Sequence, residues 1–194
     1  MHSRDERTPI LIVPGLGGSG PEHWQSHWQR AYPEARRVEQ ADWHRPVRAH
    51  WIRALAAAVA STPGAILVGH SLGCALIAHL GWQRPDLAIG GALLVAPADV
   101  DRCECLPPEV KDFAPMPLAR LPFQSVVVAS TNDPYMTIKR ATALSEAWGS
   151  PFVNAGACGH INVAAGFGPW PVGESILNDL LGAGGAAPAA RNVA

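Results

Sequence analysis

Short apolar runs alternate along the chain with longer segments in which apolar residues recur every three or four positions. The runs are rich in Val, Ile and Leu and are bounded by Gly and Pro, which is typical of buried strands in a parallel sheet. The predicted strands are 10–13, 36–39, 65–69, 92–95, 125–129 and 152–154. The predicted helices are 24–32, 47–60, 72–83, 137–148 and 173–181. This alternation predicts an α/β protein with a mostly parallel central sheet and helices on both faces.

A chain of 194 residues fits one globular domain, which we expect to span residues 9–181. The stretch 97–122 is rich in proline and has no clear periodicity, so we expect a surface connection that is too short for a separate lid domain. Residues 182–194 are low in complexity and rich in Gly and Ala, which predicts a disordered tail.

Charge is balanced, with 15 Lys and Arg against 16 Asp and Glu and no basic block. This balance argues against binding to nucleic acid or to an anionic membrane, so we expect a small molecule or peptide as ligand. The first nine residues are charged and no apolar run is long enough to cross a bilayer, which predicts a cytoplasmic protein. The four cysteines, Cys74, Cys103, Cys105 and Cys158, lack metal-ligand spacing. We expect unpaired thiols and neither a metal nor a cofactor.

The strongest local motif is Gly69-His70-Ser71-Leu72-Gly73, a G-x-S-x-G sequence. It directly follows an apolar run and opens an apolar helix, which is the setting of a nucleophile elbow. A serine at such a turn is held in strained backbone geometry with its hydroxyl above the sheet. The motif therefore predicts that Ser71 is a catalytic nucleophile.

A serine hydroxyl is a weak nucleophile, so a histidine must accept its proton and an acid must orient that histidine. Asp133 and His160 each follow a predicted strand, and the order Ser71, Asp133, His160 is the order that an α/β-hydrolase requires. Asp99 and Asp101 are rival acids, because some hydrolases place the acid after the preceding strand. We favour Asp133.

The other histidines fit the role of base less well, because they come before the expected position or lie on predicted helices. These are His23, His27, His44, His50 and His79. His70 neighbours the nucleophile, and we expect it to point away on the tight turn. The backbone N–H groups of Leu72 and of Leu16 are the expected donors to a developing oxyanion.

The loop after the first strand also offers an alternative. Residues 15–20 spell G-x-G-x-x-G and Glu39 lies about 20 residues further on, as in a dinucleotide-binding site. A dinucleotide-binding oxidoreductase is therefore an alternative hypothesis. It leaves the turns at Ser71, Asp133 and His160 unexplained.

The sequence resembles the small serine hydrolases similar to retinoblastoma-binding protein 9 and to the bacterial YdeN-type proteins. The resemblance covers the chain to about residue 181. Its motifs include Pro14-Gly15-Leu16-Gly17-Gly18-Ser19, His23-Trp24-Gln25, Asp42-Trp43, the G-x-S-x-G motif, Ser130-Thr131-Asn132-Asp133-Pro134-Tyr135, Gly159-His160-Ile161-Asn162 and Trp170-Pro171. It implies an α/β-hydrolase fold without a cap, with nucleophile, acid and base at Ser71, Asp133 and His160. It also implies carboxylesterase-like or peptidase-like activity, and some members are known for protein partners.

Three further residues are candidates for the substrate pocket. Trp43 and His44 follow a predicted strand and Trp170 lies beyond His160, so these side chains could line an open site above Ser71. An open site without a lid favours small or short acyl groups. The sequence thus predicts a serine hydrolase of small esters, and amides as a further class. The alternative from another class is a protein-binding scaffold that retains the hydrolase fold.

Overall fold

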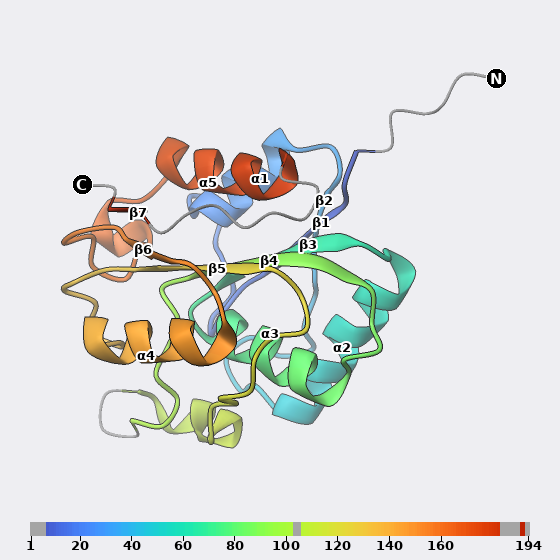
Figure 1. Ribbon diagram of the computed structural model, residues 1–194, viewed down its shortest axis with the longest axis horizontal. Coiled ribbons are helices and arrows are strands. Elements are labelled where there is room, and N and C mark those ends of the chain that lie inside the picture. The colour runs from blue at the N-terminus through green and yellow to red at the C-terminus, as the bar shows by residue number, and fades with distance from the viewer. Residues whose placement is uncertain (1–6, 103–105, 183–190, 193–194) are drawn as a thin grey trace.

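A parallel β-sheet separates two layers of helices in the computed structural model, which describes residues 7–102, 106–182 and 191–192 (Figure 1). Within these residues the sheet has seven strands in the order β2-β1-β3-β4-β5-β6-β7, and all neighbouring strands are parallel. The strands are β1 (Ile10–Val13), β2 (Ala35–Arg37), β3 (Ala65–His70), β4 (Ile89–Val95), β5 (Ser125–Ala129), β6 (Phe152–Asn154) and β7 (Arg191–Asn192). The predicted α/β class is confirmed.

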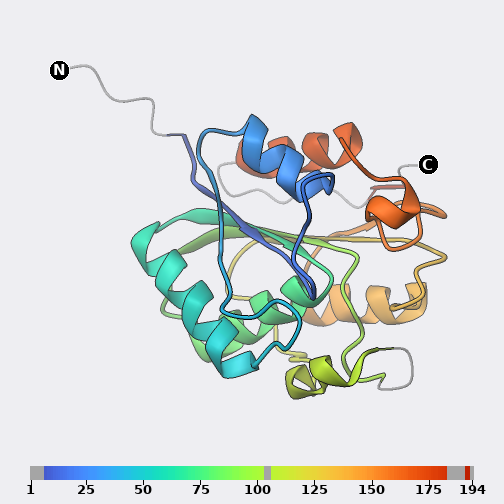
Figure 2. The same ribbon diagram turned by 180° about the vertical axis from the view of Figure 1, so that it is seen from behind.

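The helices cover both faces of the sheet, as Figures 1 and 2 show from opposite sides. Helices α1 (Trp24–Ala31) and α5 (Pro171–Gly182) lie on one face. Helices α2 (Arg48–Ser61), α3 (Leu72–Gln83) and α4 (Ile138–Trp148) lie on the other. Two short 3-10 helices, η1 (Pro108–Phe113) and η2 (Val163–Ala165), belong to connections after β4 and β6. Within the described ranges, none of the helices combines the length and apolar character that a membrane span needs.

Alternate residues of β1, β3, β4 and β5 feed two separate apolar cores. In β1, Leu11 and Val13 pack into the core beneath α2, α3 and α4, whereas Ile10 and Ile12 pack into the core beneath α1 and α5. A sheet that is buried on both faces explains why its strands appear in the sequence as continuous apolar runs. Helix α3 is central and is buried along most of its length.

Three strands differ from their predicted bounds, and β3 does so only by its last residue, His70. Strand β2 begins one residue before and ends two residues before its predicted bounds. Strand β4 begins at Ile89, three residues before the predicted start. Gly90 interrupts the apolar run there, yet a Cβ at this position would lie 2.2 Å from the carbonyl oxygen of Gly64. The absence of a side chain at Gly90 therefore lets the backbone of β4 lie close to Gly64. The hydrophobic pattern does not reveal this contact.

The connection after β4 and the end of the chain also differ from expectation in part. Segment 97–122 contains η1, whose Phe113 is buried in the core with α3, and it forms no separate lid domain. Gly182 ends α5, and Arg191–Asn192 pair with β6, although both were expected in a disordered tail. Residues 183–190 and 193–194, like Cys103 and Cys105, lie outside the described residues.

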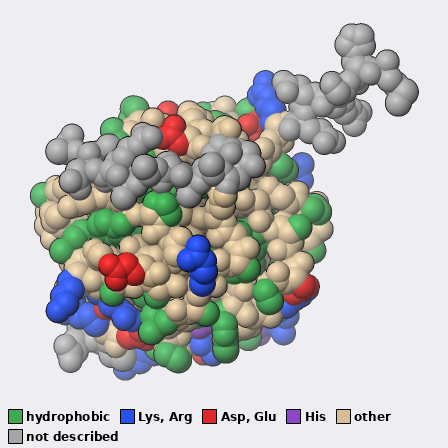
Figure 3. All heavy atoms as spheres, in the orientation of Figure 1, with side chains coloured by type: hydrophobic (Ala, Val, Ile, Leu, Met, Phe, Trp, Pro, Cys, Tyr) green, Lys and Arg blue, Asp and Glu red, His purple; other side chains and the backbone are tan. Residues whose placement is uncertain are grey.

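Charged side chains of both signs are scattered over the face that Figure 3 displays, without a large region of one sign. This distribution agrees with the formal net charge of -1.

Candidate active site

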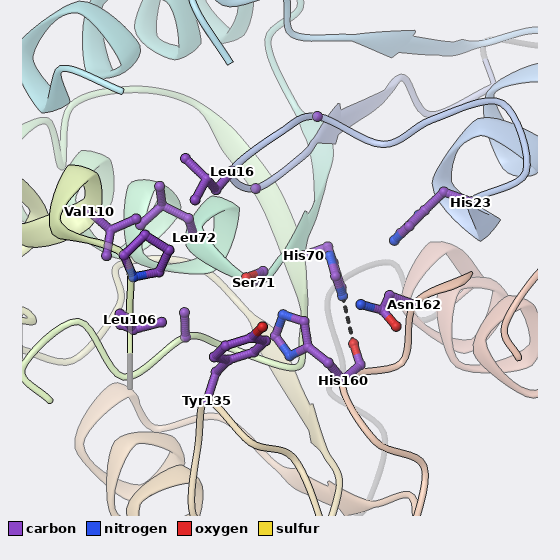
Figure 4. Close-up of a pocket in the computed structure, with 14 residues that line it drawn as sticks. Leu16, His23, His70, Ser71, Leu72, Leu106, Val110, Tyr135, His160 and Asn162 are labelled. Carbon is purple, nitrogen blue, oxygen red and sulfur yellow. Dashed lines mark hydrogen bonds between the residues drawn. The ribbon is translucent and has the colours of Figure 1, made fainter. Parts of the chain in front are cut away.

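Loops from five strands meet at the carboxyl edge of the sheet and enclose a cavity of about 220 Å³ (Figure 4). Ligand sites of open parallel sheets lie at this edge. The lining residues are Gly15, Leu16, Gly18, His23, His70, Ser71, Leu72, Ala98, Leu106, Pro107, Val110, Tyr135, His160 and Asn162.

Ser71 stands at the sharp turn between β3 and α3. Its backbone has φ 56° and ψ −121°, a conformation that a residue with a side chain rarely adopts. Such strain persists where the surrounding structure enforces it and is concentrated at functional sites. The turn leaves Ser71 partly exposed on the cavity, whereas its neighbours His70 and Leu72 are buried.

The two flanking glycines allow this turn for steric reasons. A Cβ on Gly73 would lie 2.2 Å from the carbonyl oxygen of Val13, and a Cβ on Gly69 would lie 2.7 Å from the side chain of Ile77. Strand β1 and helix α3 can therefore approach the turn closely only when these positions carry no side chain. The spacing of the G-x-S-x-G motif is thus a packing requirement.

His160 and Asp133 form a hydrogen-bonded pair beside Ser71. The Nδ1 atom of His160 lies 2.8 Å from Oδ2 of Asp133, and the two side chains are 8% and 1% exposed. Oδ1 of Asp133 accepts the backbone N–H of Tyr135 at 2.9 Å. Because a carboxylate accepts hydrogen bonds, it favours the proton on Nδ1 and leaves Nε2 of His160 as a proton acceptor. The Tyr135 ring packs edge-on against His160 at 4.7 Å between centroids.

Hydrogen bonds tie the loop that carries Asp133 to the loop that carries His160. The side-chain oxygen of Asn132 accepts the backbone N–H of Gly159 at 2.7 Å, and the hydroxyl of Ser130 accepts the N–H of Cys158 at 2.8 Å. Ser130 also donates its hydroxyl proton to Asn132 at 2.8 Å. The two loops are therefore bound to each other directly, in addition to their strands.

The rival acids have a different partner. Asp99 and Asp101 lie 3.4 Å and 2.5 Å from the guanidinium of Arg140, and Asp101 also accepts the backbone N–H of Met116. Of the three aspartates weighed in the sequence, Asp133 is the one that the structure places against the His160 ring.

The loop after β1 places Leu16 over the nucleophile turn. A Cβ on Gly15 would lie 2.9 Å from both the Ser71 Cβ and the His70 carbonyl oxygen. The N–H of Gly17 donates to the Trp43 carbonyl, and the N–H of Gly18 donates to the Gly15 carbonyl. The N–H of Leu16, in contrast, has no acceptor in the described part of the chain. Leu72 is the first residue of α3, so its N–H has no hydrogen-bond acceptor within the helix. Both groups are free to serve as donors.

Buried Gln25 anchors this loop from below. Its amide nitrogen donates to the Val68 carbonyl at 2.9 Å, and its amide oxygen accepts the hydroxyl of Ser19 at 2.5 Å. The loop after β1 is thereby fixed to β3, the strand that leads into the Ser71 turn. Gln25 is fully buried, so water does not compete for its hydrogen bonds.

Two further histidines line the cavity next to His160. The Nε2 atom of His70 lies 2.9 Å from the carbonyl oxygen of His160, and the His70 ring lies 4.8 Å from the His23 ring. His70 therefore supports the backbone of the proposed base, although the sequence predicted that it points away. Burial lowers the pKa of His70 well below its ordinary value, and nearby His160 and His23 lower it further. Burial, together with Arg37, lowers the pKa of His23 to about 4.

The three residues expected in the pocket, Trp43, His44 and Trp170, are not among those that line the cavity. Trp170 is buried in the core beneath α1 and α5, where it stacks on Trp28 at 5.9 Å between ring centroids. Trp43 packs against Trp51 at 5.5 Å, and His44 is exposed. The expectation failed because residues that follow a strand can turn either toward the site or into the core.

The lining residues that sequence reasoning missed come from two sources. Tyr135 and Asn162 lie two residues beyond Asp133 and His160 within motifs already quoted, so their proximity was a usable signal. Leu106 and Val110 come from the proline-rich connection, whose path carried no such signal.

The glycine-rich loop does not have the geometry of a dinucleotide site. In such a site the glycines lead directly into a helix whose N-terminus faces the phosphates. Here α1 begins at Trp24, after the whole motif, and the His23 side chain caps its first turn. Gly15 instead packs against Ser71. Among the described residues no group of three His, Cys, Asp or Glu could hold a metal ion.

The parallel sheet, the strained serine turn and the His160–Asp133 pair at one cavity define an α/β-hydrolase. Comparison with known families agrees: the Serine hydrolase family matches residues 10–179. The chain belongs to this family.

Solved structures support the same assignment. A protein from Pectobacterium atrosepticum, described as a YdeN-like hydrolase, is 35% identical, with a TM-score of 0.83 over 93% of this chain and 94% of that chain. The ydeN gene product of Bacillus subtilis is 18% identical, with a TM-score of 0.74 over 90% and 99% of the two chains. An esterase from Rhodococcus sp. shares the fold at 15% identity, with a TM-score of 0.63 over 91% of each chain. No match was found among curated protein sequences. The resemblance to YdeN-type hydrolases is confirmed.

Proposed function

We propose that this protein hydrolyses small or short-acyl esters through an acyl-enzyme on Ser71. The observation that carries the proposal is the shared cavity: Ser71 at its strained turn and His160, bonded to Asp133 at 2.8 Å, line the same space. A nucleophile, a base and an orienting acid in this chain order are what acyl transfer needs.

In the first half-reaction the Ser71 oxygen attacks the ester carbonyl carbon while Nε2 of His160 takes the hydroxyl proton. Asp133 holds the imidazole in the required tautomer and stabilises the imidazolium. The Leu16 and Leu72 N–H groups are proposed to bind the oxyanion. The tetrahedral intermediate then collapses, the bond to the alcohol oxygen breaks, and His160 returns the proton to the departing alcohol.

In the second half-reaction water attacks the acyl-enzyme and gives its proton to His160. Collapse of this intermediate breaks the bond to the Ser71 oxygen, which recovers the proton, and releases a carboxylic acid. Side chains of Leu16, Leu72, Leu106 and Val110 supply apolar surface at the cavity. A space of about 220 Å³ favours a short acyl group over a long chain.

Intact-mass analysis after treatment with a fluorophosphonate tests the nucleophile without knowledge of the natural substrate. We expect one adduct on the wild type and none on Ser71→Ala. Ser61→Ala is the matched control, because this exposed hydroxyl bonds to the Ala58 carbonyl at the end of α2, away from the cavity. It should keep the adduct.

Absence of an adduct on a folded wild type would contradict the proposal. The protein-binding scaffold would then become the better hypothesis. An adduct that persists in Ser71→Ala would mean that another residue is the nucleophile.

A further inference from the structure

The cavity has two chemically different sides. In Figure 4 the apolar side chains of Leu16, Leu72, Leu106 and Val110 lie to one side of Ser71, whereas His23, His70 and Asn162 lie to the other. The proposed mechanism makes use of Ser71 and His160 but assigns no role to His23 or Asn162. Their polar atoms therefore call for a separate explanation.

His23 presents an unpartnered hydrogen-bond donor at the cavity wall. Its side chain is 6% exposed, and Nδ1 accepts the backbone N–H of Gln25 at 3.2 Å. An Nδ1 atom that accepts a hydrogen bond carries no proton, so the proton of the neutral ring is on Nε2. Burial and the neighbouring Arg37 keep the ring neutral by lowering its pKa to about 4. In the described part of the chain this buried Nε2 atom has no hydrogen-bond partner.

Asn162, which lines the same cavity, offers a second donor. Its side-chain oxygen accepts the backbone N–H of Ala165 at 3.1 Å and so caps η2. This bond fixes the orientation of the amide and leaves the NH₂ group on the other side. Figure 4 shows the Asn162 nitrogen turned toward His70 and the Asn162 oxygen turned away.

The position of these donors indicates which part of a substrate they meet. His160 must give its proton to the departing alcohol, so the alcohol portion lies beside the His160 ring. His70 contacts the His160 carbonyl at 2.9 Å, and His23 packs on His70 with ring centroids 4.8 Å apart. The polar side is therefore the side of the leaving group, and the apolar side is left for the acyl group.

We propose that His23 and Asn162 form a subsite that binds an acceptor oxygen in the alcohol portion of the ester. The subsite rests on the proposed function, since it is defined relative to Ser71 and His160. The favoured substrates are esters of alcohols that carry an ether or hydroxyl oxygen two carbons from the ester oxygen. A buried donor without a partner is unfavourable, so an alcohol that supplies the missing acceptor is bound in preference to a hydrocarbon.

A pair of isosteric esters tests this proposal. 2-Methoxyethyl acetate and butyl acetate have chains of equal length and differ in one ether oxygen that replaces a methylene. We expect wild-type kcat/KM to favour the methoxyethyl ester by about fivefold to tenfold, which is the effect of one hydrogen bond. His23→Asn should abolish this preference, because asparagine keeps the helix cap but does not reach the cavity.

Two further variants separate recognition from stability. His23→Gln keeps an amide donor near the Nε2 position but loses the cap, so it should recover part of the preference while Tm falls. Asn162→Asp keeps the acceptor for Ala165 but removes the NH₂ donor, and it should reduce the preference. If His23 acted only through the helix cap, His23→Asn would keep the ester preference and His23→Gln would lose it.

The outcomes distinguish the subsite from the underlying reaction. A wild type labelled by fluorophosphonate that shows no preference between the esters overturns the subsite and leaves the proposed function standing. A preference that His23→Asn keeps overturns it as well. Absence of labelling in the wild type overturns both proposals.

Discussion

Asp133, Asp99 and Asp101 follow neighbouring strands at the same edge of the sheet, but they have different partners. Asp133 contacts His160, while the other two bind Arg140. We expect Asp133→Asn to lower kcat by about 10⁴-fold, because an amide in this place stabilises the wrong tautomer of the base and no longer stabilises the imidazolium. Steady-state hydrolysis of a short-chain ester measures the effect.

Asp101→Asn is the control for this prediction. It neutralises a rival acid, and the new amide can still accept the Met116 N–H that Asp101 accepts at 2.9 Å. We expect kcat to change far less than in Asp133→Asn. The reverse ranking would show that the acid has been assigned to the wrong strand.

His23 and His70 predict how stability depends on pH. Burial lowers both pKa values in the folded protein, His23 to about 4 and His70 well below 6.5, whereas in the unfolded chain both rings titrate near 6.5. Below pH 6.5 the unfolded chain therefore binds more protons, and the free energy of unfolding falls until the folded pKa is reached. Tm should decrease from pH 7 to pH 4.5. His23→Asn should show a shallower decrease, and an equal slope would contradict this origin.

Among the elements, the loop after β1 depends most on a missing side chain. A Cβ on Gly15 would approach Ser71 and His70 to 2.9 Å, whereas a Cβ on Gly20 in the same loop meets nothing within 4 Å. Gly15→Ala should destabilise the protein by about 1–3 kcal/mol and lower kcat, since the loop must move away from the nucleophile turn. Gly20→Ala should leave both unchanged. Urea unfolding and ester hydrolysis measure the two effects.

The sequence predicted elements best where burial is continuous. The helix predicted over 72–83 has the bounds of α3, and the strands predicted at 10–13, 125–129 and 152–154 match β1, β5 and β6. The apolar pattern failed at Gly90, which lies within β4 at a register shift between the paired residues Ile89 and Gly91 and is not hydrophobic. Backbone contacts of this kind have no signature in hydrophobic periodicity.

The residues of the proposed triad could be chosen from the sequence because their chemistry restricts residue type and chain order. Ser71, Asp133 and His160 all lie at strand ends in the expected sequence. The cavity wall follows no comparable rule. Trp170 was expected in the pocket and no role was predicted for Val110, because the packing of both depends on the path of whole connections through space. Val110 lines the cavity and also packs in the core with α3, whereas Trp170 is buried in the core beneath α1 and α5.

At the scale of the molecule, the connection between β4 and β5 limits the size of the cavity. Its Leu106 and Val110 lie on the side of Ser71 opposite His23 and His70, and its Pro107 also lines the cavity. We expect kcat/KM to fall as the acyl chain of a 4-nitrophenyl ester grows from acetate to decanoate. A flat or rising profile would contradict a small acyl site.

Val110→Ala tests which residues set this limit. It removes two methyl groups from the wall, so the ratio of octanoate to butyrate kcat/KM should rise about fourfold, the effect of burying roughly one additional methylene. Val47→Ala is the matched control, because Val47 is 44% exposed and lies before α2, outside the cavity lining. Its ratio should equal that of the wild type.

The hydrogen bonds from Gly159 to Asn132 and from Cys158 to Ser130 join the loops of the acid and the base. The segment 130–159, which includes α4 and β6, therefore has its two ends joined by hydrogen bonds beside Asp133 and His160. When the edge of the sheet fluctuates, the carboxylate and the imidazole move as one body relative to the serine. In the proposed mechanism, such motion changes the distance over which the Ser71 proton is transferred, while the hydrogen bond between His160 and Asp133 is kept.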